Sequence, residues 1–180
     1  DYTVEIVGGS LGASFFRETL FALMIAFLFM GIVVFLYFRI FVPSMAVILA
    51  VFSDIVVTLA ILNLLEIKIS TAGIAAFLML IGYSVDTDIL LSTRVLKRKD
   101  GTVQDRILGA IKTGIMMSST TIVAALVGLL FAQSDVIKQI MLIILIGLLV
   151  DMIFTWIQNV GLLKLHLERK EKKLLAKNEI

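Results

Sequence analysis

Five long, almost uncharged apolar segments constrain the fold of this chain more than any other feature of its sequence. They cover residues 19–38, 40–65, 69–93, 113–132 and 139–163. A bilayer core about 30 Å thick requires roughly 20 apolar residues of α-helix, and each segment reaches that length. The runs are continuous rather than alternating, which argues against a membrane β-barrel. The sequence therefore predicts an all-α polytopic membrane protein, built as a bundle of five transmembrane helices.

The composition agrees with this interpretation and argues against several kinds of functional site. Hydrophobic residues make up 60% of the 180 residues, more than a soluble domain needs. The chain has no cysteine and therefore no disulfide or thiolate metal site, and its single histidine, His166, lies in a charged tail. No phosphate-loop, HExxH or nucleophile-elbow motif occurs. We therefore expect neither an enzyme nor a metal or other cofactor.

The first 18 residues differ from the apolar segments. Residues 1–7, with the sequence DYTVEIV, alternate in polarity and predict a short β-strand. The glycine-rich residues 8–12 predict a flexible joint before the first membrane span. Because a single strand has no partner within this chain, we expect residues 1–18 to be the end of an extracytoplasmic domain whose remainder precedes them.

The basic residues predict the orientation of the bundle. They gather in residues 94–112, between the third and fourth spans, and in the tail of residues 164–180. The positive-inside rule places both segments in the cytoplasm, so an odd number of spans leaves the N-terminal end outside. Acidic residues are interspersed among the basic ones, and anionic lipid headgroups account for them. We therefore expect contact with the lipid bilayer and no nucleic acid.

Four aspartates lie within the apolar segments, where no lysine or arginine occurs. They are Asp54, Asp86, Asp88 and Asp151. A charged aspartate at a helix centre costs about 2.5–3.5 kcal/mol on insertion scales. We therefore expect these side chains to be protonated, or to face the bundle interior, a watery cavity or a partner chain. Because desolvation disfavours the charged form of a carboxyl group, each is a candidate proton carrier.

Asp86 and Asp88 cannot share one helix face, because positions two apart point about 200° from each other. We expect Asp86 to face the bundle and to lead the proton-coupling candidates, and Asp88 to reach interfacial water or the basic residues beyond Ser92. Asp54 and Asp151 lie near the middle of their spans, and both a coupling role and a structural hydrogen bond remain open for them. The expected hydrogen-bonding neighbours are Ser53, Thr58, Asn63 and residues 118–121.

Small residues in the third and fourth spans predict close helix packing, because they let two helix backbones approach. They are Ala72, Gly73, Ala75, Ala76 and Gly82 in the third span, and Gly114, Ser118, Ala125 and Gly128 in the fourth. We expect the third span to be central, with the fourth against it.

Three segments of the chain resemble a known family of membrane proteins. They are IVGGSLG before the first span, FSDIVVTLA in the second and LIGYSVDTDILLSTRVLKRK in the third. They look like SecF, the membrane subunit of the SecD–SecF protein-export complex, in its archaeal version and within the resistance-nodulation-division superfamily. The resemblance implies helices two to six of a six-helix subunit, which assists preprotein export across the cytoplasmic membrane. It implies SecD, the SecY/SecE translocon and a preprotein as partners, and a proton gradient as driving force, with sodium as the open alternative.

The resemblance also implies roles for individual residues. Asp86 follows the GYSV motif where SecD proteins place a carboxylate, whereas bacterial SecF proteins continue with Asn-Asp. Residues 118–121 resemble a hydroxyl-rich element of the fifth family helix, and Lys112 lies beside the position of a bacterial arginine. The implied supporting polar residues are Ser84, Lys112, Ser118, Ser119 and Thr121, and the motif glycines are Gly12 and Gly82.

Two other functions fit the same sequence. An exporter of lipids or small molecules from the same superfamily would need a second homologous half in one chain. A passive scaffold of the translocon, without ion coupling, predicts that all four aspartates tolerate replacement by asparagine with only a modest loss of stability.

Overall fold

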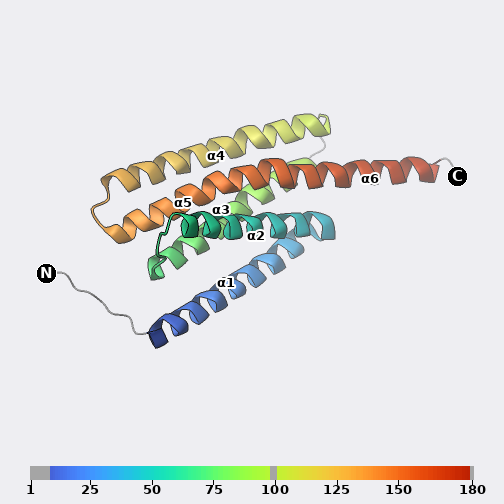
Figure 1. Cartoon of the computed structure of the whole chain (residues 1–180). Helices are drawn as coiled ribbons and strands as arrows, with labels where there is room; N and C mark the ends of the chain where they lie inside the picture. The colour runs from blue at the N-terminus through green and yellow to red at the C-terminus, as the bar shows by residue number, and fades with distance from the viewer. Residues whose placement is uncertain (1–8, 98–100, 179–180) are drawn as a thin grey trace.

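The computed structural model of the chain describes residues 9–97 and 101–178, and within them every regular element is a helix. The strand expected over residues 1–7 lies outside the described residues. The C-terminal half contains one long continuous helix in which a π-helical segment, η1, joins α5 to α6 (Figure 1). The elements are α1 (Gly9–Phe38), α2 (Phe41–Leu64), α3 (Thr71–Leu96), α4 (Val103–Phe131), α5 (Asp135–Ile153), η1 (Phe154–Asn159) and α6 (Val160–Asn178).

Five of the described helical segments are long and apolar enough to cross a membrane, which confirms the predicted all-α polytopic bundle. They are Leu20–Phe38, Phe41–Leu64, Thr71–Leu96, Val103–Phe131 and Asp135–Arg169. The expected joint at residues 8–12 is wrong from residue 9 onward, because α1 already begins at Gly9. Once a helix is nucleated, each further residue adds a hydrogen bond, and this extension outweighs the low helix propensity of glycine.

Helix α4 also begins earlier than the apolar pattern predicted, at Val103 instead of residue 113. Its start is fixed by a capping box, in which the Asp105 amide donates to Thr102 Oγ1 at 3.2 Å and the Thr102 amide donates to Asp105 Oδ2 at 2.9 Å. Arg94 then donates from α3 to the Gly109 carbonyl at 2.6 Å. The basic connection is therefore largely helical and tied to α3.

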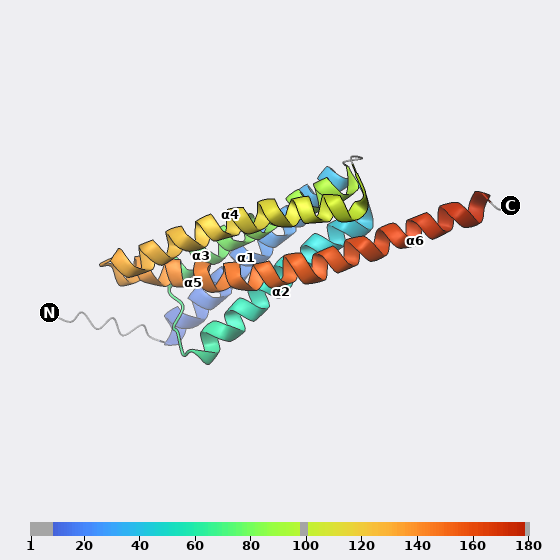
Figure 2. The same cartoon turned by 90° about the horizontal axis from the view of Figure 1, so that it is seen from above.

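The short connections lie at the two ends of the bundle. Arg39, between α1 and α2, and Glu66, between α2 and α3, both adopt left-handed φ angles, of 51° and 56°. The α1–α2 and α3–α4 connections lie at the end from which α6 projects beyond the other helices (Figure 2). The α2–α3 and α4–α5 connections lie at the opposite end, where Gln139 bonds to Ser70 and to the Lys68 carbonyl.

Helix α3 is the central element, as the small residues predicted. It packs against α1, α2, α4 and α5, and α4 lies against both α3 and α5 (Figures 1 and 2). A Cβ at Gly147 of α5 would collide with Leu80, so this glycine permits the close approach of α5 to α3, whereas one at Gly114 of α4 would collide with Trp156 of η1. Helix α1, by contrast, leaves most of its described apolar side chains exposed, as suits a helix that faces lipid.

Candidate functional site

Three carboxyl groups from three helical elements meet inside the bundle. Asp54 of α2, Asp88 of α3 and Asp151 of α5 are each no more than 1% exposed, and hydrogen bonds through neighbouring serine and threonine side chains link them. We call these three residues the carboxylate cluster. None of the described lysine and arginine side chains forms an ion pair with it. Burial of several acidic groups without a basic partner is costly in a membrane protein and is typical of ion pathways.

Asp88 is held by side chains from the π-helical segment. Its Oδ1 atom accepts a hydrogen bond of 2.6 Å from Asn159 Nδ2 and one of 2.9 Å from Thr155 Oγ1. Thr155 Oγ1 also lies 3.2 Å from Asp151 Oδ1. A single hydroxyl group therefore connects two members of the cluster.

The remaining hydrogen bonds of the cluster come from α3. Ser84 Oγ donates to Asp54 Oδ2 at 2.5 Å, and Thr87 Oγ1 lies 3.3 Å from Asp151 Oδ2. Both donors are fully buried. Thr87 Oγ1 also donates to the Ser84 carbonyl at 2.9 Å, so all three carboxyl groups belong to one network that links α2, α3, α5 and η1.

The π-helical segment explains why Asp151, Thr155 and Asn159 share one face. In an α-helix, each step of four residues drifts by roughly 40° around the axis. A π-helix has more residues in each turn, so the step from Thr155 to Asn159 turns back and cancels part of this drift. The segment therefore presents both side chains to Asp88, in keeping with the frequent occurrence of π-bulges at functional sites.

The expected placement of Asp86 and Asp88 is wrong, because the two residues have exchanged faces. Asp86 is exposed and Asp88 is fully buried. The depth of the two aspartates in the span and the basic residues beyond Ser92 suggested the opposite. The rotation of α3 about its axis determines which aspartate faces the bundle. Asp88 continues a buried stripe of three- and four-residue steps that runs through Ser84, Leu91 and Val95. That spacing is visible in the sequence and could have placed Asp88 inside.

The expected hydroxyl partners are largely replaced by others. Ser53 donates to the Leu49 carbonyl, and Thr120 and Thr121 donate to the Met117 carbonyl, so none of them bonds to an aspartate in the described structure. Backbone carbonyls of the same helix satisfy these hydroxyl groups locally. Thr155 and Asn159 take the expected role, and Thr87 Oγ1 lies 3.3 Å from Asp151 although its shorter bond, of 2.9 Å, goes to the Ser84 carbonyl. The four-residue spacing from Asp151 was the signal that could have found Thr155 and Asn159.

The remaining polar residues and glycines that the sequence suggested form no hydrogen bond with the carboxylate cluster in the described structure. Lys112, Ser119 and Asn63 are exposed, and Thr121 reaches Tyr83 Oη at 3.5 Å. Gly82 is exposed on α3, and the surroundings of Gly12 are not described.

Several buried polar atoms of the bundle, some of them in the carboxylate cluster, have no hydrogen-bond partner among the described residues. Besides Gln158 Nε2, they are Asp54 Oδ1, Thr58 Oγ1, Asp88 Oδ2, Ser92 Oγ, Ser118 Oγ and Asn159 Oδ1. Unsatisfied buried polar groups are rare in folded proteins and call for an explanation such as water, an ion or a proton. An oxygen-rich interior of this kind can bind a small cation or exchange protons.

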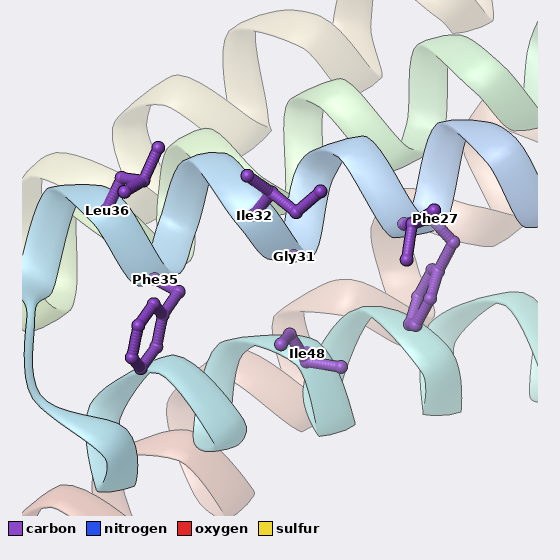
Figure 3. A pocket seen from close by; sticks show the side chains of 7 residues that line it. Phe27, Gly31, Ile32, Phe35, Leu36 and Ile48 are labelled. Carbon is purple, nitrogen blue, oxygen red and sulfur yellow. The ribbon is translucent and has the colours of Figure 1, made fainter.

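Among the described residues, the carboxylate cluster coincides neither with a group of metal ligands nor with an apolar-lined groove. Among the described residues, no group of three or more histidine, cysteine, aspartate or glutamate side chains is placed to hold a metal ion. A groove between α1 and α2 is lined by apolar side chains that include Phe27, Phe35 and Ile48 (Figure 3). It contains none of the cluster residues, and its lining suits a lipid-facing surface.

The chain is similar to proteins of known classification. Residues 1–169 match the family described as "Protein export membrane protein SecD/SecF, C-terminal". The protein-export membrane protein SecF of Methanolacinia petrolearia is 44% identical over 175 residues, which cover 96% of this chain and 62% of that protein. The SecF of Pyrococcus furiosus is 44% identical, over 93% of this chain and 57% of that protein. The SecF of Methanothermobacter thermautotrophicus is 47% identical, over 91% and 59%. The chain therefore spans about three fifths of the length of these relatives.

Proposed function

Because this chain belongs to the SecD/SecF C-terminal family of protein-export membrane proteins, we propose that it is the membrane bundle of a SecF-type subunit. In this function it assists the export of preproteins across the cytoplasmic membrane, together with SecD and the SecY/SecE translocon. The family supports the role in export, and the carboxylate cluster supports the mechanism.

The buried network of Asp54, Asp88 and Asp151 carries the mechanistic proposal. A carboxyl group in a dry interior changes its protonation when water reaches it, and movement of one charge across 100 mV supplies about 2.3 kcal/mol. Since the network joins α2, α3, α5 and η1, a proton that enters it changes the contacts between these helices. The ion gradient is thereby coupled to a rearrangement of the bundle that assists export.

The exposed stripe of α3 supports a contact with SecD. This stripe consists of Ala75, Met79, Gly82 and Asp86, which are exposed within a membrane-spanning helix. Helices α1 and α4 flank α3. A carboxylate that faces lipid is unfavourable, and small residues favour close approach of another helix. We infer that a transmembrane helix of SecD covers this stripe.

The positions of the basic residues support the proposed orientation. The α3–α4 connection and α6 lie at the same end of the bundle (Figure 2), and both are rich in lysine and arginine. By the positive-inside rule this end is cytoplasmic, and the start of α1 is then on the outside.

An export assay tests the proposed mechanism. The full-length protein and an Asp151→Asn variant are compared in vesicles that contain SecD and the translocon, with and without an imposed pH gradient. We expect the variant to lose the gradient-dependent part of export by at least about tenfold, or about 1.4 kcal/mol of activation free energy.

Asp135→Asn is the matched control, because Asp135 is an exposed carboxylate paired with Lys138 at the end of the bundle. It should export at the native rate. A native gradient response in Asp151→Asn at equal membrane abundance would contradict the coupling mechanism and favour a passive scaffold.

A further inference from the structure

A pocket of about 420 Å³ opens at the end of the bundle opposite to α6. The α2–α3 and α4–α5 connections lie together at this end (Figure 2), and residues of the α2–α3 connection, α4 and the first turns of α5 line the pocket. We call it the end pocket. Its apolar lining consists of Ile67, Leu129, Val136 and Leu142, and it contains none of the residues of the carboxylate cluster.

Two lysines from separate parts of the chain also line the end pocket. Lys68 belongs to the α2–α3 connection and is exposed, whereas Lys138 lies in the first turn of α5 and is half-buried. The acidic residue of the lining is Asp135, whose side chain is fully exposed and lies 3.9 Å from Lys138. Because such an exposed pair contributes little binding energy, both ammonium groups can bind another anion.

The end pocket is held in shape by one glutamine. The Gln139 amide donates to the Lys68 carbonyl and accepts a hydrogen bond from Ser70 Oγ. These bonds fix the α2–α3 connection to α5 and so keep the two lysines at one pocket. Ser134, which precedes α5, forms no side-chain capping bond, so the start of the helix adds a favourable potential for a negative group.

The lining of the end pocket matches a ligand with one charged end and one apolar end. Leu142 lies seven residues into α5, which places it about 10 Å inward from the start of the helix. The ends of membrane spans lie near the lipid headgroups, so the lysines meet the headgroup layer and the leucines meet the acyl chains. A small soluble anion would leave the apolar lining unused, and a lipid without net charge would leave the lysines without a partner.

We propose that the end pocket binds an anionic phospholipid. The phosphate group lies between Lys68 and Lys138, and the first part of an acyl chain lies along Leu129 and Leu142. Lysine side chains near the membrane surface attract anionic headgroups in this way. The site goes beyond the proposed function, and it lies at the opposite end of the bundle from the basic connection and tail.

Photolabelling of the full-length protein tests this site. The protein is placed in phosphatidylcholine nanodiscs with a small amount of phosphatidylglycerol that carries a photoactivatable group in its acyl chain. After illumination and cleavage with chymotrypsin, labelled peptides are identified by mass spectrometry. We expect labelling of the peptides that contain Leu129 and Leu142, and at least about fivefold less labelling by the corresponding phosphatidylcholine probe.

Exchange of the lysines tests their role without disturbing the packing of the bundle. Each of Lys68→Gln and Lys138→Gln should reduce the labelling of these peptides by about fivefold, since a lysine near the membrane surface contributes about that factor to the binding of an anionic lipid. Lys68→Arg keeps the charge and should retain the labelling. Lys112→Gln, an exposed lysine of α4 outside the end pocket, should leave it unchanged.

Three results would overturn the proposal. The first is equal labelling by the phosphatidylglycerol and phosphatidylcholine probes, and the second is native labelling in both glutamine variants. The third is loss of labelling when soluble glycerol phosphate is added in excess, because it would show that the pocket binds a small anion rather than a lipid.

Discussion

Helix α3 has two faces, each of which carries an aspartate, and the chain itself covers only one of them. Ser84 and Asp88 lie on the covered face, where α2, α5 and η1 supply neighbours. Gly82 and Asp86 lie on the exposed stripe. The two carboxylates are two residues apart and at nearly the same depth, so their difference arises from the rotation of the helix alone.

The two aspartates illustrate two ways in which a membrane protein accommodates a carboxylate. Asp88 is accommodated within the chain by hydrogen bonds from Thr155 and Asn159. Asp86 has no such cover in the described structure, which points to a contact supplied by another chain. The first arrangement suits an ion-binding function, and the second suits assembly.

We expect the largest difference in stability between two variants: one that places a bulky side chain against the covered face of α3, and one that places it on the exposed stripe. A Cβ at Gly147 would collide with the buried Leu80 of α3, whereas one at Gly82 meets no atom within 4 Å. Overpacking of a filled core costs typically about 1–3 kcal/mol. We expect Gly147→Leu to lower the thermal unfolding temperature of the full-length protein in detergent, and Gly82→Leu to leave it nearly unchanged. Equal losses in the two variants would contradict the assigned faces.

We expect the same Gly82→Leu variant to weaken the assembly with SecD, although it leaves the unfolding temperature nearly unchanged. A leucine at this position holds a second helix away from the small-residue stripe. We expect the fraction of SecD that co-purifies with the variant to fall by about fivefold, which corresponds to about 1 kcal/mol. Asp135→Asn is again the control. Native recovery of SecD with Gly82→Leu would place the SecD contact elsewhere on the bundle.

The sequence predicted the helices of this bundle better than it predicted their rotation. Continuous apolar runs are sufficient to locate five spans, because the bilayer fixes their length. The early start of α4 was missed because its signal is the local capping box of Thr102 and Asp105, which lies outside the apolar run.

The site was only partly predictable, for a different reason. Asp54, Asp88 and Asp151 stand out as charges in apolar runs, so they could be found from the sequence. Their partners Thr155 and Asn159 follow Asp151 at four-residue steps, but the face that they share also depends on the π-helical segment, which the sequence pattern does not predict. Which aspartate is buried follows from packing against other helices, and only the spacing of the buried stripe in α3 hints at it.

We expect the smallest difference in stability when a single hydroxyl group is removed, either beside the buried cluster or at an exposed position of α3. Thr87 Oγ1 lies 3.3 Å from the buried Asp151, and Thr93 Oγ1 lies 3.3 Å from Tyr37 Oη in an exposed position. Valine has nearly the same shape as threonine but cannot form either bond. Interhelical hydrogen bonds in membranes contribute about 0.6 kcal/mol on average, so we expect Thr87→Val to cost about that much in a denaturant titration of the full-length protein. Thr93→Val should cost less, because water can replace the lost partner of Tyr37. A larger cost for Thr93→Val would show that exposure in the isolated bundle is no guide to which contacts of α3 stabilise it.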